Sequence, residues 1–168
     1  MLNLLPSVFV LGLAALAALA LALGRRSPPD SAAERLAAAH AITLALVIQS
    51  IHFTEETVTG FHERFPAVFG LPAMPLSIFV VFNLAWIGIW IASVPGLRSG
   101  RALAFFAAWF LAIAGMINGI AHPLLAINAG GYFPGLLSSP VIGAVGVLLS
   151  LRLRRATRPK DDVSFGIS

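Results

Sequence analysis

Five long apolar stretches constrain this chain more than any other feature of its sequence. They cover residues 5–23, 36–54, 76–94, 102–121 and 133–151. Each is close to the roughly 20 residues that an α-helix needs to cross about 30 Å of hydrocarbon. Because no water reaches the bilayer interior, a segment there must pair its own backbone groups, which a helix does. The sequence therefore predicts an all-α fold, a polytopic membrane helical bundle with five transmembrane helices.

The composition excludes most soluble classes of protein. Of the 168 residues, 58% are hydrophobic and 11% are charged, whereas a soluble domain carries about 25% charged residues. The chain has no cysteine, which rules out disulfides, thiol catalysis and cysteine-ligated zinc. We expect residues 1–158 to form a single membrane domain and residues 159–168 to be a disordered cytoplasmic tail. The expected partners are membrane lipids, and the net charge of +4 requires no nucleic-acid partner.

Basic residues predict the orientation of the bundle. Of the eleven Lys and Arg residues, ten flank the first and third connections or follow the fifth stretch. With five spans these ten fall on one side, and only Arg64 falls on the other. Because cytoplasmic loops are enriched in Lys and Arg, we expect the N-terminus outside and the C-terminus in the cytoplasm of a cell or inner membrane. No basic residue precedes the first stretch, which favours an uncleaved span over a cleaved signal peptide.

A polar segment with the sequence HFTEE, residues 52–56, ends the second stretch. His52 lies three and four residues before Glu55 and Glu56, so on a helix all three share one face. Ionisable residues in membrane spans are rare and usually mark a functional site. Gln49, one turn earlier, is expected to orient the His52 ring. Glu56 follows the stripe of Gln49 and His52 more closely than Glu55 does, so we expect Glu56 to face the bundle.

A second polar pair, Asn118 and His122, lies in the fourth stretch. These two residues are four apart, so they also share a helix face. His52 lies 17 residues after Arg35, and Asn118 lies 17 residues after Arg101, which places each about 26 Å from the basic side. The second and fourth stretches run in the same direction, so we expect the two polar clusters in one layer near the outer face.

Further side chains are expected at this depth. Asn83 lies 15 residues before Arg98, about 22 Å along the third helix, and can join the site or bond a neighbouring helix. Tyr132 belongs to a loop rich in turn-forming residues, 128–135, and can donate a hydrogen bond into the site or anchor at the interface. A short interfacial helix over the mouth of the bundle is predicted by three phenylalanines spaced by four: Phe61, Phe65 and Phe69.

With these residues in place, the chain resembles the HXXEE family of small integral membrane proteins. The match consists of residues 52–56, of Asn118-x-x-x-His122 and of the loop Tyr132-x-Pro-Gly135. It covers most of the chain, from the second stretch to the fifth. The family is defined by its motif and has no settled biochemical role. The resemblance therefore implies a membrane protein with a polar site.

The residue types at this site favour a bound divalent metal, Zn or Fe. His52 and His122 supply imidazoles, and Glu55 or Glu56 supplies a carboxylate, a donor set that proteins use for zinc and non-haem iron. The other glutamate is then free to act as a general base. The leading hypothesis is a membrane enzyme that hydrolyses or oxidises a hydrophobic, lipid-soluble substrate. Its candidate catalytic residues are His52, Glu55, Glu56 and Tyr132, supported by Gln49, Asn83 and Asn118.

Three other interpretations remain open. A metal-free acid–base isomerase or cyclase would protonate a sterol- or terpene-like lipid through a glutamate, since desolvation favours the protonated form of a carboxyl group. A proton- or cation-coupled transporter is the second, although only His40 and Thr43 extend the polar residues towards the basic side. The third is a purely structural cluster, in which the histidines hydrogen-bond the glutamates.

Overall fold

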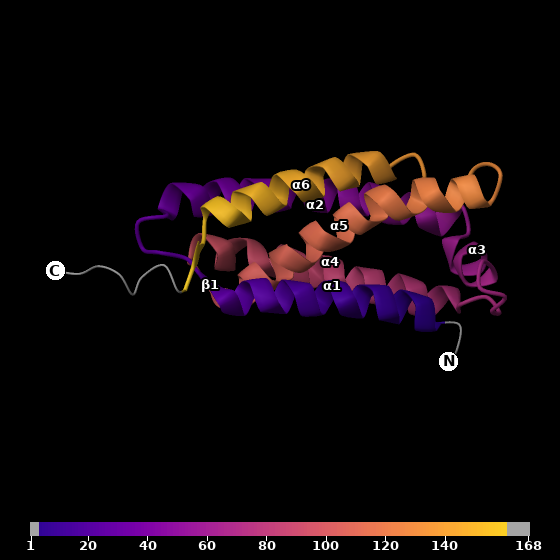
Figure 1. Ribbon diagram of the computed structural model, residues 1–168, viewed down its shortest axis with the longest axis horizontal. Helices are drawn as coiled ribbons and strands as arrows, with labels where there is room; N and C mark the ends of the chain where they lie inside the picture. The colour runs from indigo at the N-terminus through magenta and orange to yellow at the C-terminus, as the bar shows by residue number, and fades with distance from the viewer. Residues whose placement is uncertain (1–3, 161–168) are drawn as a thin grey trace.

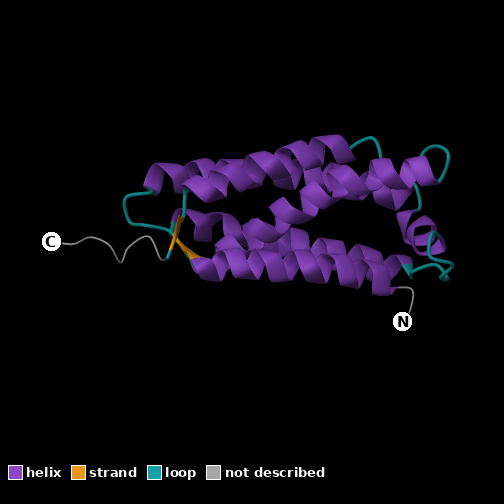
Figure 2. Cartoon of the chain, in the orientation of Figure 1, coloured by secondary structure: helices purple, strands orange, loops and turns teal. Residues whose placement is uncertain are grey.

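The computed structural model describes residues 4–160, which form six α-helices and a two-stranded β-pairing (Figure 1, Figure 2). The elements of this part are α1 (Leu5–Gly24), β1 (Arg25–Arg26), α2 (Ala32–Val58), α3 (Phe61–Ala67), α4 (Leu76–Arg98), α5 (Ala102–Asn128), α6 (Ser139–Arg155) and β2 (Arg158–Pro159). The helices α1, α2, α4, α5 and α6 run lengthwise beside one another, and the short α3 lies at one end of the bundle (Figure 1). The prediction of an all-α bundle is confirmed.

Among the described residues, four helices are long and apolar enough to cross a membrane: α1, α2, α4 and α5. Their mean hydropathies over 18 residues are 2.4, 1.6, 2.0 and 2.0. The chain is therefore a helical membrane protein. The prediction of five spans is wrong, because α6 has only 17 residues, about 25 Å along its axis. Its last turn also carries three arginines, Arg152, Arg154 and Arg155.

The predicted fifth span differs from the structure at its start, where residues 133–138 form no α-helix. Gly135 has a φ of 84°, a left-handed conformation that an α-helix does not contain. α6 begins only at Ser139, and Pro140 lies in its first turn, where a missing N–H costs no hydrogen bond. Phe133 in this loop is apolar and buried. The hydropathy of this segment therefore resembles that of a membrane span, although its backbone is not helical.

α5 is the central helix of the bundle. It packs along α1, α4 and α6, while α2 packs along α4 and α6. Glycines allow α5 and α6 to approach closely: a Cβ added to Gly119 would lie 2.7 Å from the Cα of Gly143. One added to Gly146 would lie 2.7 Å from the carbonyl oxygen of Ala112. The rest of the main core is apolar and rich in alanine.

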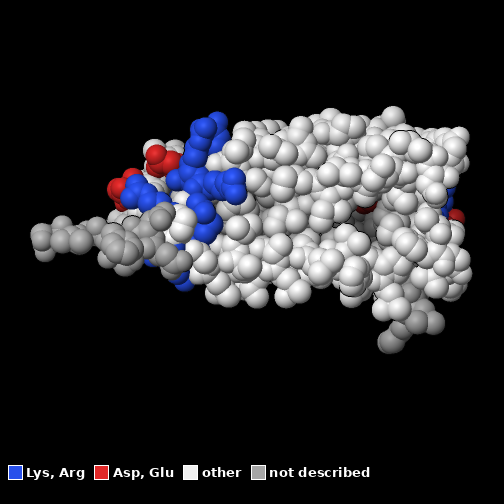
Figure 3. Space-filling view, in the orientation of Figure 1, with Lys and Arg blue, Asp and Glu red and all other residues white. Residues whose placement is uncertain are grey.

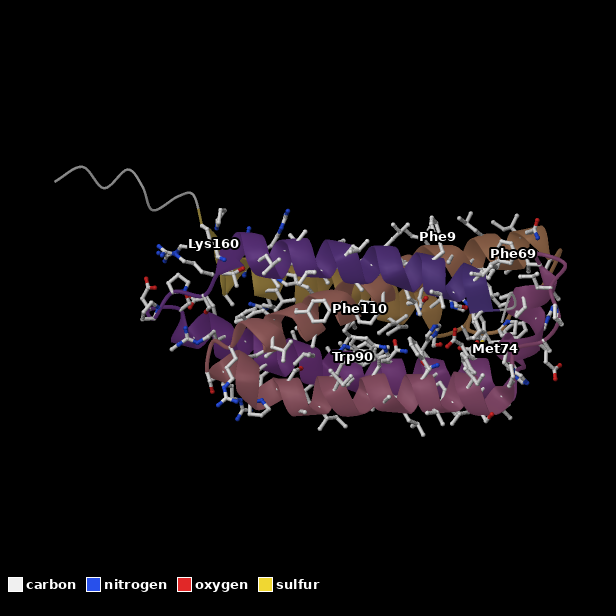
Figure 4. The ribbon with its side chains drawn as sticks, turned by 90° about the horizontal axis from the view of Figure 1, so that it is seen from below. Phe9, Phe69, Met74, Trp90, Phe110 and Lys160 are labelled. Atoms are coloured by element: carbon white, nitrogen blue, oxygen red, sulfur yellow. The ribbon has the colours of Figure 1, made fainter. Side chains whose placement is uncertain are left out.

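The two ends of the bundle differ in charge. Lys and Arg side chains gather at the end that carries β1 and β2 (Figure 3). There Arg25 donates hydrogen bonds to Oγ1 and the carbonyl of Thr157, at 2.8 and 2.7 Å. The backbone N–H of Lys160 donates to Gly24 O at 3.1 Å, at the end marked by Lys160 in Figure 4. Of the predicted disordered tail, Pro159 belongs to β2, and residues 161–168 lie outside the described residues.

Candidate metal centre

His52, Glu56 and His122 form a buried cluster near the end of the bundle opposite the arginines. His52 and Glu56 lie one turn apart on α2, and His122 lies on α5. Glu56 Oε1 is 3.6 Å from His52 Nε2 and 3.3 Å from His122 Nε2. The three ligand atoms lie within 4.8 Å of one another. At most 7% of any of these side chains is exposed, so the protein shields the cluster almost completely.

One hydrogen bond fixes the tautomer of the His122 ring. Nδ1 lies 2.6 Å from the carbonyl oxygen of Pro134. A carbonyl oxygen only accepts hydrogen bonds, so Nδ1 carries the ring proton. In the neutral imidazole Nε2 then keeps its lone pair, and this lone pair faces Glu56.

His52 is oriented in the same way through a hydroxyl group. The His52 Nδ1 lies 2.8 Å from Ser138 Oγ, and the Ser138 hydroxyl donates a hydrogen bond to the Glu55 carboxylate. The serine oxygen therefore accepts from Nδ1–H of His52, which leaves a lone pair on Nε2. This buried Nε2 has no hydrogen-bond partner among the described residues. Sequence reasoning expected Gln49 to orient this ring, whereas the structure assigns that contact to Ser138.

The cluster is thus an arrangement of acceptors with no donor. Two imidazole lone pairs and one carboxylate oxygen point at the same small volume. Buried acceptors without a donor or a cation are costly, and native proteins rarely leave them unsatisfied. The arrangement consequently requires a bound cation or a proton.

Glu55, the other glutamate of the HFTEE segment, lies outside the cluster and binds the loop before α6. It accepts hydrogen bonds from Tyr132 Oη at 2.8 Å, Leu137 N at 3.0 Å and Ser138 N at 2.9 Å, in addition to Ser138 Oγ. Partial burial raises the pKa of the Tyr132 phenol above its usual range, so the phenol stays protonated and donates at neutral pH. Glu55 therefore attaches the loop to α2, and Ser138 connects Glu55 to the His52 ring through its two hydrogen bonds.

Gly135 places this loop directly over the two histidines. A Cβ at this position would lie 2.5 Å from Cε1 of His122 and 2.9 Å from Cε1 of His52. Only glycine combines that close approach with the positive φ of the turn. The loop thus covers the cluster on one side. Sequence reasoning identified Gly135 as a turn former, but it missed the contacts of Pro134 and Ser138 with the histidines.

Aromatic rings lie against His122. The rings of His52 and His122 meet edge to face, with centroids 4.8 Å apart. Phe61 of α3 and Phe133 of the loop lie 5.5 and 6.4 Å from the His122 ring. α3 is the short helix predicted from the phenylalanine spacing, and it lies at the cluster end of the bundle (Figure 1). The two phenylalanine rings therefore cover part of the His122 ring.

A cavity of about 470 Å³ extends from the cluster between α1, α4 and α5. Glu56 and His122 line it, and so do the three predicted supporting residues, Gln49, Asn83 and Asn118. Figure 3 shows a hollow in the apolar face with an acidic side chain inside, and Glu56 is the acidic residue that lines the cavity. The cavity therefore gives a molecule of moderate size access to one side of the cluster.

Comparisons with protein-family models, with curated proteins and with solved structures gave no match for this chain. The resemblance to the HXXEE family therefore rests on the motif residues and stays an expectation. Function has to be inferred from the geometry of the cluster and its cavity.

Proposed function

We propose that His52, Glu56 and His122 bind a divalent metal ion, and that the protein is a membrane enzyme acting on a lipid-soluble substrate. Two imidazole nitrogens and one carboxylate oxygen, with a position left open, are typical ligands of zinc and of non-haem iron. Ligands about 2.1 Å from a tetrahedral ion are about 3.4 Å apart. The distances of 3.3 and 3.6 Å from Glu56 to the two histidines match this spacing.

The observation that carries the proposal is the unsatisfied Nε2 of His52. One proton on Glu56 can be donated to His122 or to His52, but not to both. If His122 receives it, Nε2 of His52 remains buried without a partner. A single cation among the three atoms satisfies all of them. The cluster geometry therefore favours a metal ion over a shared proton.

The surrounding residues support chemistry at such a centre. A bound divalent ion would supply Lewis-acid chemistry, polarising a carbonyl group or lowering the pKa of water. Pro134 and Ser138 hold the two imidazoles in the tautomer that a metal needs. At most 7% of each of the three side chains is exposed, and such burial strengthens electrostatic interactions inside the cluster. Hydrolysis or oxidation of a lipid-soluble substrate is the reaction class that this combination favours.

We further propose that the cluster lies near the outer face of the membrane, with the arginine end in the cytoplasm. The support is the separation of charge along the bundle, since Lys and Arg gather at the end away from the cluster (Figure 3). Cytoplasmic ends of membrane proteins carry such an excess. The N-terminus would then lie outside.

The metal content of the purified protein tests this function. We expect close to one zinc or iron per chain by elemental analysis, and its loss in His52→Ala and in His122→Ala. His40→Ala is the matched control, because His40 also lies on α2 but is exposed. Protein that carries no metal after gentle purification, and gains no thermal stability from added Zn²⁺ or Fe²⁺, would overturn the proposal.

A metal-free acid–base enzyme is the second candidate, and one observation favours it. Glu56 lies 3.3 Å from His122 in a cavity with aromatic walls that include Phe79 and Trp86. Aromatic faces stabilise cationic species, such as those formed when an alkene is protonated. In that case Glu56 would be the acid, and isomerase or cyclase activity on sterol- or terpene-like lipids would survive complete removal of metal.

A further inference from the structure

The shape of the cavity indicates an elongated ligand. Its lining runs along α4 from Ile78 to Trp90 and along α5 from Phe110 to Leu125. At 1.5 Å per residue these stretches are about 18 and 22 Å long. Trp90 and Phe110 lie near the middle of the bundle, while Met74 lies at the cluster end (Figure 4). A volume of about 470 Å³ falls within the range of natural small-molecule sites.

Polar groups line only the part of the cavity towards the cluster. Besides Glu56 and His122, these are the side-chain amides of Gln49, Asn83 and Asn118, together with Ser7 near the start of α1. Beyond them the lining is apolar as far as Trp90 and Phe110. A ligand that fits this distribution has a polar group at one end and a hydrocarbon body.

The charges around the cavity disfavour a diphosphate head group. No Lys or Arg is among the described residues that line it. Arg64 is near the cluster end, but its guanidinium lies over the Phe133 ring, 5.5 Å from the centroid. Without a metal, a phosphate or carboxylate in the cavity would be desolvated beside the Glu56 carboxylate with no basic side chain to pair with. A divalent ion at the cluster would leave one net positive charge beside Glu56, too little to neutralise a diphosphate. An uncharged polar end therefore fits the cavity best.

α4 and α5 contribute aromatic side chains to the hydrocarbon part of the cavity, and α1 contributes aliphatic ones. Phe79, Phe82, Trp86, Trp90 and Phe110 all contribute to its walls. Flat faces of this kind pack well against unsaturated, methyl-branched chains, whose C–H edges meet the negative faces of the rings. α1 and α4 both line the cavity yet pack mainly on other helices. A hydrophobic ligand can therefore enter from the bilayer on that side.

From these observations we infer that the cavity binds an uncharged isoprenoid-type lipid with one oxygen-bearing group, an alcohol, an aldehyde or a ketone. The oxygen lies at Glu56 and His122, and the chain extends towards Trp90 and Phe110. This inference deepens the proposed function and rests on it for the chemistry at the oxygen. Lipid diphosphates are not ligands of this cavity.

Two probes with the same hydrocarbon chain test the charge selectivity. Tritiated farnesol and tritiated farnesyl diphosphate are titrated onto the full chain in phosphatidylcholine nanodiscs. We expect saturable farnesol binding and at least tenfold weaker binding of the diphosphate. Equal or tighter binding of the diphosphate, or no saturable farnesol binding, would overturn the inference.

A matched pair of glycine variants tests the location. A Cβ added at Gly12 on α1 or at Gly88 on α4 meets nothing within 4 Å, so both positions accept a larger side chain. Gly12 lines the cavity and Gly88 does not. Gly12→Phe should weaken farnesol binding at least tenfold and Gly88→Phe should leave it unchanged. Equal effects of the two variants would show that farnesol binds elsewhere.

The outcome is separable from that of the metal proposal. Farnesol binding is measured before and after chelation, alongside the metal content of each sample. Selective farnesol binding by protein that carries no metal as purified would support the ligand inference while contradicting the metal proposal. A stoichiometric metal without selectivity between the two probes would do the reverse.

Discussion

Replacing Ser138 with alanine should lower the metal affinity of the cluster by about 10- to 100-fold while leaving the fold intact. Ser138 is the link between Glu55 and His52: its oxygen accepts from His52 Nδ1, and its hydroxyl donates to Glu55. Without it, nothing holds the His52 proton on Nδ1. The proton can then move to Nε2, which lies 3.6 Å from Glu56 Oε1, and it occupies the lone pair that the metal needs.

The size of the effect follows from the hydrogen bonds that are lost and those that remain. Partners that orient a metal-bound histidine typically contribute 10- to 100-fold in affinity, or about 1.4 to 2.8 kcal/mol. Glu55 keeps its bonds from Tyr132 Oη, Leu137 N and Ser138 N in the variant, because none of them uses the serine hydroxyl. The loop therefore stays attached to α2, and unfolding should change much less than metal binding.

Competition with a chelator of known affinity measures the metal dissociation constant in detergent micelles. Ser139→Ala is the control: it removes the hydroxyl of the next residue, which donates to Leu136 O, away from the histidines. Nitrogen-15 shifts of the His52 ring report the tautomer directly. An unchanged dissociation constant in Ser138→Ala, or the same loss in Ser139→Ala, would refute the role assigned to this serine.

Three further predictions test the loop and the topology. Gly135→Ala should destabilise the protein by more than the roughly 1 to 3 kcal/mol of backbone strain alone, because its Cβ also collides with both histidines. Gly70 has a φ of 67° and open space around it, so Gly70→Ala should cost only the backbone strain. Thermal unfolding of the two variants makes the comparison. Tyr132 is the single tyrosine, so absorbance titration of the folded protein should give a pKa above the ordinary 10.0. The stability that the protonated phenol contributes should be lost as pH rises through that pKa. A pKa equal to that of the denatured chain would contradict the contact with Glu55. Because the chain has no native cysteine, Leu137→Cys should react with an impermeant maleimide in intact cells and Ser99→Cys only after lysis, and the opposite pattern would reverse the proposed orientation.

Hydropathy located four of the helices because spans are apolar by physical necessity, but it underestimated their lengths. α2 extends four residues beyond the predicted end at 54, through both glutamates. This polar turn fits inside the bundle because Glu55 accepts hydrogen bonds from the loop before α6 and Glu56 faces the two histidines. The hydroxyls of Thr54 and Thr57 bond carbonyls one turn back instead of requiring water. An apolar stretch that is ended at its first charged residue cannot include such a turn.

The proximity of His52 and His122 was predictable because counting residues from a common basic side measures depth in a bundle of parallel helices. The choice of Glu56 over Glu55 followed from helical spacing. The contacts of the loop were not predictable in this way. Nothing in the sequence distinguishes Ser138, which binds His52, from Ser139, which bonds the backbone. That difference arises only when Gly135 turns the chain over the histidines.

The central claim is that His52, Glu56 and His122 hold one metal ion, and elemental analysis of these variants tests it most directly. We predict about one equivalent of zinc or iron in the wild type and in His40→Ala. The same analysis should find less than a tenth of that in His52→Ala, in Glu56→Gln and in His122→Ala, each purified as a folded protein. Metal retained in all three of these variants, or absent from the wild type with no stabilisation by added Zn²⁺ or Fe²⁺, would contradict it.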